Sequence, residues 1–147
     1  MTLYLDTSAL VKLYVAEDGS TLVRRAIADA DRVATSEIAY VEARAAFARR
    51  RREGNLLPVQ QRRIVRALDA DWGRYLRLDV TETLIRQAAV LAERHRLRAY
   101  DAIHLASAAL LKARLGPPVV FACWDDPLAA AARREGLAPL PNRPHAG

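Results

Sequence analysis

Four carboxylates of this sequence lie in or beside apolar stretches, where an unpaired acid is energetically costly. Asp6 follows the apolar run LYL, Glu42 lies within SEIAYVEARAAFA, Asp101 begins DAIHLASAALL, and Asp125 follows VVFACW. If the fold brings them together, the four carboxylates repel one another strongly, so some of them must become protonated or bind cations. Because no cysteine or histidine cluster accompanies them, their oxygens favour a hard ion, Mg²⁺ or Mn²⁺, over zinc.

A divalent ion in such a cluster can lower the pKa of a bound water and stabilise the charge on a phosphodiester during in-line displacement. The whole chain is basic, with 23 Lys and Arg residues against 17 Asp and Glu and a formal net charge of +6. This excess favours polyanionic partners, nucleic acid first, although the abundance of Ala and Arg could equally reflect a GC-rich genome. An acidic centre in a basic shell is suited to drawing in a phosphate chain.

Two of the acids follow apolar strands, and for each of them a purely structural role is the alternative to a functional one. Asp-Thr-Ser before a helix is an ordinary capping sequence, so Asp6 could be a helix N-cap. In the run Asp125-Asp126-Pro127, the proline fits the first helical position, which makes Asp126 the expected N-cap. Asp125 is then the acid that remains at the carboxyl end of its strand without a capping role.

Glu42 lies on or beside the apolar stripe of its helix. One turn away on either side are Ile38, Ala45 and Ala46, and Arg49 is two turns on. A surface ion pair with an arginine one turn away is the structural alternative, but none of these one-turn neighbours is charged. The spacing therefore predicts that Glu42 finds its partner outside its own helix.

Asp101 opens an apolar helix and shares a face with His104, three residues later. An acid at a helix N-terminus is stabilised by the helix dipole, which is the structural alternative for Asp101. His104 could orient a carboxylate or a water, but a lone histidine on an apolar face is more often a hydrogen-bonded packing residue.

Four consecutive arginines, 49–52, end a predicted helix in the run AFARRRREG. Cations are favourable at a helix C-terminus, and four in a row must point around the whole helix, so a solvated helix end is one interpretation. The functional interpretation is that Arg49, on the side of Glu42, approaches substrate phosphate. Trp72, Tyr75 and Trp124 are too dispersed for a base-stacking surface and are expected in the core or an interface.

These residues must be positioned by short apolar strands that alternate with helices. The pattern predicts an α/β/α sandwich, a mainly parallel sheet flanked by helices, with functional groups at the carboxyl ends of its strands. Helix N-caps are expected at Thr35 or Ser36 and at Thr81. The expected strands are 2–6, 32–34, 76–80, 119–124 and 137–140, and the expected helices are 7–16, 20–30, 37–52, 58–75, 82–95, 99–114 and 126–135.

The length of 147 residues fits one domain over residues 1–140, followed by a mobile tail over 141–147. No apolar run is long enough to cross a bilayer, and the N-terminus lacks the basic region of a signal peptide. Cys123 is the single cysteine and cannot form an internal disulfide. These features predict a cytoplasmic protein that does not use a membrane.

In order and spacing, LYLDTSALVKLY, ATSEIAYVEARAA, AYDAIHLASA and CWDDPLAAAARREGL resemble a PIN-domain ribonuclease, most closely a VapC-type toxin of a toxin–antitoxin pair. The resemblance carries the four metal-site acids of that family onto Asp6, Glu42, Asp101 and Asp125. It also places the hydroxyl pair that supports a metal-bound water or a carboxylate at Thr7 and Ser8, and a frequent histidine of unsettled role at His104. The sequence departs from the family at Cys123, where threonine or serine is usual.

The resemblance implies an endoribonuclease that uses Mg²⁺ or Mn²⁺, forms a homodimer, cleaves RNA and is neutralised by a short VapB-type antitoxin. Asp6, Asp101 and Asp125 are the expected metal ligands, and Glu42 is a ligand or a water-positioning base. The alternatives are a PIN nuclease for RNA maturation without an antitoxin, and a catalytically silent module that binds RNA or protein. A haloacid-dehalogenase-like phosphotransferase is disfavoured because its motif needs an acid where this chain has Ser8.

Overall fold

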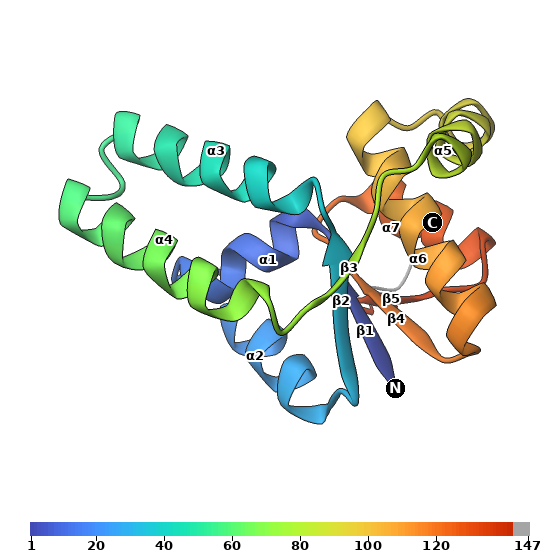
Figure 1. Ribbon diagram of the computed structural model, residues 1–147, viewed down its shortest axis with the longest axis horizontal. Helices are drawn as coiled ribbons and strands as arrows, with labels where there is room; N and C mark the ends of the chain where they lie inside the picture. The colour runs from blue at the N-terminus through green and yellow to red at the C-terminus, as the bar shows by residue number, and fades with distance from the viewer. Residues whose placement is uncertain (143–147) are drawn as a thin grey trace.

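In the computed structural model, which describes residues 1–142, five strands form a single parallel sheet (Figure 1). The strand order is β3-β2-β1-β4-β5, and each neighbouring pair is parallel. The predicted parallel sheet is therefore confirmed. The strands are β1 (Thr2–Leu5), β2 (Arg32–Ser36), β3 (Leu76–Leu78), β4 (Val119–Ala122) and β5 (Ala138–Leu140).

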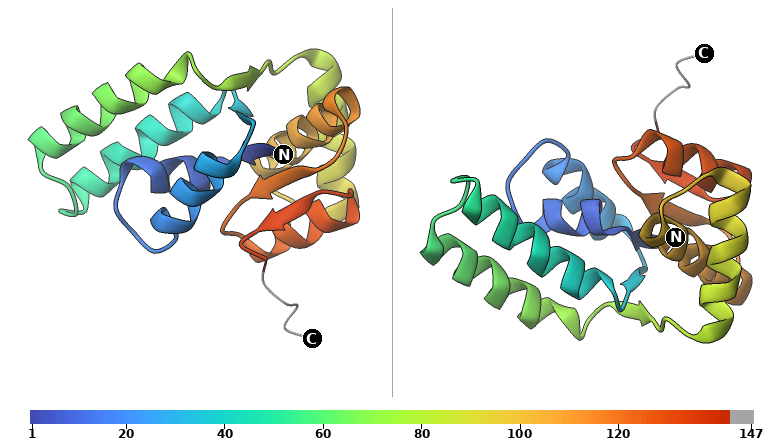
Figure 2. Two further views of the ribbon diagram at one scale, coloured as in Figure 1. Left: turned by 90° about the horizontal axis from the view of Figure 1, so that it is seen from below. Right: turned by 90° about the horizontal axis from the view of Figure 1, so that it is seen from above.

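Helices cover both faces of this sheet, as predicted for an α/β/α sandwich. Figures 1 and 2 show α1 to α4 on one side of the strands and α5 to α7 on the other. The first group consists of α1 (Thr7–Tyr14), α2 (Ser20–Asp29), α3 (Ala39–Arg52) and α4 (Pro58–Trp72), and the second of α5 (Glu82–His95), α6 (Ala99–Leu115) and α7 (Asp126–Arg134).

The central strand β1 contributes to both hydrophobic cores. Leu3 and Leu5 pack in the core on the α1–α4 side, whereas Tyr4 packs in the core on the α5–α7 side, and all three are 0% exposed. Alternation along a strand sends successive side chains to opposite faces, and parallel strands are buried on both faces. The strand LYL is therefore apolar throughout, and Asp6 is the first residue beyond it.

Helices α3 and α4 run side by side away from the sheet (Figures 1 and 2). Helix α3 begins close to the carboxyl end of β2 and carries the arginine run at its far end. One face of α3 is held in the core by Ala39, Ala43 and Phe47. The face that bears Glu42 is thus fixed relative to the sheet.

Helix caps are the part of the prediction that the structure corrects in this region. Thr81 caps α5 as predicted, since its Oγ1 accepts a hydrogen bond from the Leu84 amide at 3.1 Å. Thr35 and Ser36 are not the N-cap of α3: both are buried in β2, and Thr35 donates to the Leu5 carbonyl at 2.8 Å. Because these residues still pair with β3, the helix can begin only after Ile38.

Among the helices of residues 1–142, none is long and apolar enough to span a bilayer. The tail predicted over 141–147 falls mainly on residues 143–147, which lie outside the described residues.

Candidate active site

The four predicted acids line one cleft at the carboxyl edge of the sheet. Strands β1 and β4 are neighbours in register, with Leu5 opposite Ala122, so Asp6 and Asp125 emerge side by side from the middle of the sheet. Glu42 comes from α3 on one face and Asp101 from α6 on the other. The cleft has a volume of about 600 Å³ and continues along α3, whose residues Ala45, Ala46 and Arg49 line it together with Glu42.

Asp6 caps a helix and also lines the cleft. Its Oδ1 accepts hydrogen bonds from the Ala9 amide at 2.9 Å and the Ser8 hydroxyl at 2.6 Å, so it is the N-cap of α1. Within the described residues, Oδ2 receives no such bond, and the side chain lines the cleft. Burial raises the pKa of Asp6 to about 6, even though His104, Ser8 and the Ala9 amide act to lower it.

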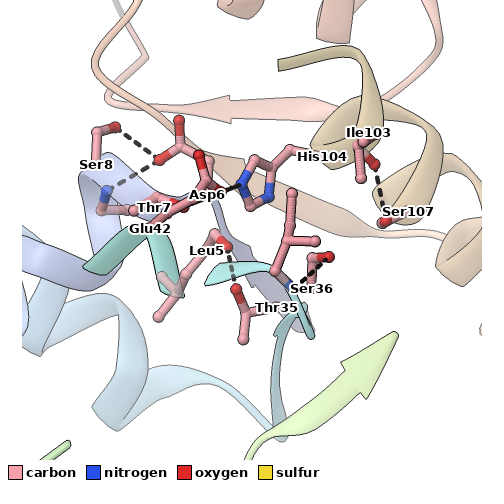
Figure 3. A network of polar contacts seen from close by, with 12 residues as sticks. Leu5, Asp6, Thr7, Ser8, Thr35, Ser36, Glu42, Ile103, His104 and Ser107 are labelled. Carbon is pink, nitrogen blue, oxygen red and sulfur yellow. Dashed lines mark hydrogen bonds and ion pairs between the residues drawn. The ribbon is translucent and has the colours of Figure 1, made fainter. Parts of the chain in front are cut away.

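Glu42 finds its partners on other elements, as its spacing predicted. Its Oε1 accepts a hydrogen bond from the Thr7 hydroxyl at 2.7 Å and contacts Nε2 of His104 at 2.9 Å (Figure 3). Burial acts to raise the pKa of Glu42, but the interactions with His104 and Thr7 outweigh it and hold the pKa below its usual range. Glu42 therefore stays ionised, and its Oε2 is left without a hydrogen bond from residues 1–142.

His104 is both a packing residue and a partner of the site. Its side chain is 2% exposed, and its Nδ1 lies 2.8 Å from the Tyr4 hydroxyl. Burial raises the pKa of Tyr4 well above its usual value, so this hydroxyl keeps its proton and can donate it to Nδ1. In that arrangement Nε2 carries the imidazole proton and faces Glu42 and the Thr7 hydroxyl, the latter at 3.1 Å.

Tyr4 is a residue of this network that the sequence analysis missed. Its ring is buried and stacks on Phe121 with centroids 5.4 Å apart, which is the role that an apolar strand predicts. The available signal was its hydroxyl, because a buried tyrosine usually needs a hydrogen-bond partner. The sequence could not show that His104, one hundred residues away, supplies that partner.

Asp125, and not Asp126, is the N-cap of α7. Its Oδ1 accepts a hydrogen bond from the Leu128 amide at 2.9 Å, and the helix begins at Asp126. The sequence prediction was wrong by one residue because Pro127 occupies the second helical position, where an amide donor is also dispensable. Asp125 still lines the cleft, with Oδ2 as the oxygen that does not cap the helix.

Arg98 joins Asp101 to Asp125 across the cleft and is the second residue that the sequence analysis missed. Its Nε donates to Oδ2 of Asp101 at 3.1 Å, and its Nη2 lies 3.5 Å from Oδ2 of Asp125. The hydrogen bond to Asp101 and the charges of both acids raise the pKa of Arg98. The spacing of three residues between Arg98 and Asp101 was the visible signal, but the contact with Asp125 depends on the fold.

The arginine run divides around α3, as consecutive helical residues must. Arg49, Arg50 and Arg52 line the cleft, whereas Arg51 lies 3.2 Å from the side chain of Gln61 on α4. Arg50 is paired with Glu17 at 2.9 Å. The cleft therefore joins an acidic end at the sheet to a basic wall along α3.

Trp124 also lines the cleft but is not a free stacking surface. Its ring lies against Gly19, where an added Cβ would come within 2.6 Å of the ring, and Lys12 lies 4.9 Å from the ring centroid. Gly19 has φ +93°, a conformation that glycine adopts readily. Trp124 is packed between two neighbours, in agreement with the expectation that it is a core or interface residue.

The acids fit a hard divalent cation in the chemistry of their donors. All four offer carboxylate oxygens, burial disfavours the charge of Asp6, and the Arg98 guanidinium already places positive charge between Asp101 and Asp125. In the present side-chain positions, no three acidic, histidine or cysteine residues among 1–142 are grouped closely enough to hold a metal ion. The fit is therefore one of donor type rather than of a closed coordination shell.

The family model for the PIN domain matches residues 3–115, a range that includes three of the four acids. The chain belongs to the PIN-domain family. This PIN domain is of the VapC type: it is 35% identical over 138 residues to Ribonuclease VapC45 of Mycobacterium tuberculosis (strain CDC 1551 / Oshkosh), with 94% of each chain covered. Ribonuclease VapC49 of Mycobacterium tuberculosis (strain ATCC 25618 / H37Rv) matches with the same identity and coverage.

Solved structures confirm the PIN fold. FitAcB from Neisseria gonorrhoeae matches with a TM-score of 0.63 at 19% identity, over 93% of this chain and 95% of that one. VapBC-5 from Mycobacterium tuberculosis, a member of the VapBC family of toxin-antitoxin systems, matches with a TM-score of 0.61 at 20% identity, over 94% and 96%. The predicted fold class and the predicted family are both confirmed.

Cys123, where the sequence departs from the usual PIN pattern, is buried beneath the site. Its side chain belongs to the core on the α5–α7 side, and its Sγ lies 3.8 Å from the Asp125 carbonyl oxygen. Burial raises the pKa of this thiol to about 12, with the nearby acids acting in the same direction. The thiol therefore stays protonated and acts as a packing group rather than as a metal ligand.

Proposed function

We propose that this PIN domain is a Mg²⁺- or Mn²⁺-dependent endoribonuclease that acts as a VapC-type toxin. The observation that carries the proposal is the shared cleft of Asp6, Glu42, Asp101 and Asp125, which continues into a basic wall. The names of the two relatives support ribonuclease activity. The basic wall is evidence for a substrate that carries a chain of phosphates, because cationic side chains attract and contact phosphate groups.

Asp6, Asp101 and Asp125 are the proposed ligands of the divalent ion. When bound, the ion would supply a water of lowered pKa and positive charge beside the reacting phosphate. Asp6 and Asp125 each use one oxygen to cap a helix, which fixes the direction of the other. The caps of Asp6 and Asp125 thereby orient these two donors before any ligand arrives, which limits the reorganisation needed at them during the reaction.

Glu42 is proposed as a ligand or as the group that orients the attacking water. Its lowered pKa makes it a weak proton acceptor near neutral pH, which favours holding and orienting over general-base catalysis. His104 and Thr7 fix its Oε1. Thr7 and Ser8 thus act as supporting residues, Thr7 through Glu42 and Ser8 through Asp6.

Arg49 is the proposed phosphate contact. It lines the cleft on the same face of α3 as Glu42, and unlike its neighbour Arg50 it is not engaged by Glu17. A guanidinium at this position can form two parallel hydrogen bonds to a phosphate. The RNA chain would then run from the acids outward along α3.

The proposed partners are a VapB-type antitoxin and a second copy of this chain. The VapBC-5 structure supports a protein partner, because it is a member of a toxin-antitoxin family and this chain shares its fold. The homodimer remains a prediction from the sequence resemblance, and the cytoplasmic location also remains a prediction.

Cleavage of total RNA with mapping of the new ends tests the activity. We expect cleavage in Mg²⁺ or Mn²⁺, loss in EDTA, and a loss of about a hundredfold or more in Asp6→Asn, since a metal ligand is removed. Asp79→Asn is the matched control: Asp79 also follows a strand end, after β3, but is exposed and does not line the cleft. Equal cleavage by wild type and Asp6→Asn, or undiminished cleavage in EDTA, would contradict the mechanism.

Expression in cells tests the role as a toxin. We expect wild-type protein to arrest growth, Asp6→Asn to be harmless, and a small protein encoded beside this chain to restore growth when co-expressed. RNA cleavage without growth arrest would instead favour an RNA-maturation nuclease.

A further inference from the structure

Arg98 lies where the helix backbone does not favour a cation. It occupies the N-cap position of α6, makes no capping hydrogen bond with its side chain, and faces the positive end of the helix dipole. The first residues of α7 are close by, since Asp125 caps that helix. Among residues 1–142, Arg98 is therefore held by the side chains of the two acids and not by the helix backbone.

The atoms that Arg98 contacts are those a metal ion would need. Oδ1 of Asp125 is committed to the Leu128 amide, so Oδ2 is its remaining donor, and this is the oxygen 3.5 Å from Nη2 of Arg98. Oδ2 of Asp101 accepts from Nε of the same guanidinium at 3.1 Å. A guanidinium and a divalent ion cannot both occupy the space between these two oxygens.

The Arg98 contacts are also easily exchanged. The side chain of Arg98 is 80% exposed, and its contact with Asp125, at 3.5 Å, is long for a hydrogen bond. Exposed ion pairs of this kind are weak and readily displaced. A divalent ion carries twice the charge, and its ligands would include oxygens from outside this pair.

We infer that Arg98 is the resident counter-ion of Asp101 and Asp125, which it holds together in the metal-free protein and releases to the divalent ion when the site is loaded. This inference rests on the proposed metal-dependent function. It assigns Arg98 as a positioning residue that competes with the metal. Once displaced, the guanidinium remains at the rim of the cleft that it already lines.

Metal binding without substrate tests this exchange directly. Wild type and Arg98→Gln are titrated with Mn²⁺, and free Mn²⁺ is followed by electron paramagnetic resonance. We expect Arg98→Gln to bind Mn²⁺ about fivefold more tightly, the scale set by two exposed ion pairs. Arg98→Lys should fall between the two, because an ammonium keeps the charge but cannot fork between two carboxylates.

Arg52→Gln is the matched control, because it removes one positive charge from the same cleft at a residue that makes no ion pair with the four acids. Wild type that binds Mn²⁺, with Arg98→Gln no tighter than Arg52→Gln, would overturn the inference and leave the proposed function standing. Weaker binding by Arg98→Gln would also overturn it. Failure of every variant and of wild type to bind Mn²⁺ would overturn the metal-dependent function itself.

Discussion

Asp6 is the most deeply buried of the four acids, at 4% exposure, and its protonation is linked to folding. Burial raises its pKa from 3.8 to about 6. The folded protein therefore keeps a proton that the unfolded chain releases between about pH 4 and pH 6. Over this window the free energy of unfolding of the metal-free protein falls as pH rises. The ionised carboxylate of Asp6 therefore destabilises the fold at neutral pH.

Replacing Asp6 with asparagine should relieve this penalty, since asparagine caps a helix about as well as aspartate. In EDTA at pH 7.5, we expect the free energy of unfolding of Asp6→Asn to exceed that of wild type by about 2 kcal/mol. The difference should vanish near pH 4. Urea denaturation at the two pH values measures both differences. A gap that is equal at the two pH values, or that Asp79→Asn reproduces, would show that burial of this carboxyl is not its cause.

Tyr4 positions His104, and through it Glu42, without touching the cleft. In Tyr4→Phe, Nδ1 of His104 loses its partner, and we expect a stability loss of about 1 kcal/mol. We further expect ¹⁵N NMR of the imidazole to show a change in tautomer population, and kcat for RNA cleavage to fall about tenfold with little change in KM.

Tyr75→Phe is the control for this prediction, because Tyr75 is also buried and its hydroxyl contacts Tyr14 on the other side of the sheet. It should alter stability alone. An unchanged imidazole spectrum in Tyr4→Phe would remove Tyr4 from the positioning chain.

At the scale of elements, the starts of α1 and α7 are parts of the candidate site. Asp6 and Asp125 each direct one oxygen to the helix they cap and leave the other at the cleft. Helix formation and donor placement are thus served by the same side chains. For this reason the two interpretations offered by the sequence, cap or ligand, do not exclude each other.

Substitutions at Asp125 should separate the two roles. We expect Asp125→Ala to lower the free energy of unfolding by about 1 kcal/mol, and Asp125→Asn to leave it nearly unchanged because the amide oxygen can still accept from Leu128. Both should reduce RNA cleavage. Thermal unfolding in EDTA beside a cleavage assay provides the comparison, and retained cleavage in either variant would argue against Asp125 as a donor.

The sequence predicted elements and faces better than it predicted contacts. Apolar runs bounded by glycine, proline and polar residues located all five strands, and helical spacing placed Glu42, Ala45, Ala46 and Arg49 on one face. Caps were misassigned by one to three residues, since strand pairing and a proline set where a helix begins. The contacts of Arg98 with Asp125 depend on how α6 meets β4, which no local pattern encodes.

At the scale of the whole molecule, the charges are segregated along one cleft rather than averaged over the surface. The carboxylates lie where the two central strands end, and the arginines follow α3 away from the sheet. Under the proposed function, a phosphate chain drawn to the basic wall would be led to the acids. The net charge of +6 alone could not have indicated this direction.

Salt dependence of RNA binding should report this segregation. In an Asp6→Asn background, which prevents cleavage, we expect Arg49→Gln to reduce the slope of log affinity against log salt by about 0.7, the value for one phosphate contact on a single strand. Arg51→Gln, from the same run but directed toward Gln61, should leave the slope unchanged. Equal effects of the two substitutions, measured by fluorescence anisotropy, would indicate diffuse attraction instead of a contact at Arg49.

The double use of Asp6 and Asp125 has a consequence for engineering this protein. A substitution that removes the cap also disturbs the direction of the oxygen that faces the cleft, so stability and activity fall together when either acid is detached from its helix. Inactive forms for structural work are therefore better made with asparagine, which keeps the helix cap and removes only the carboxylate. Alanine removes the cap and the carboxylate together.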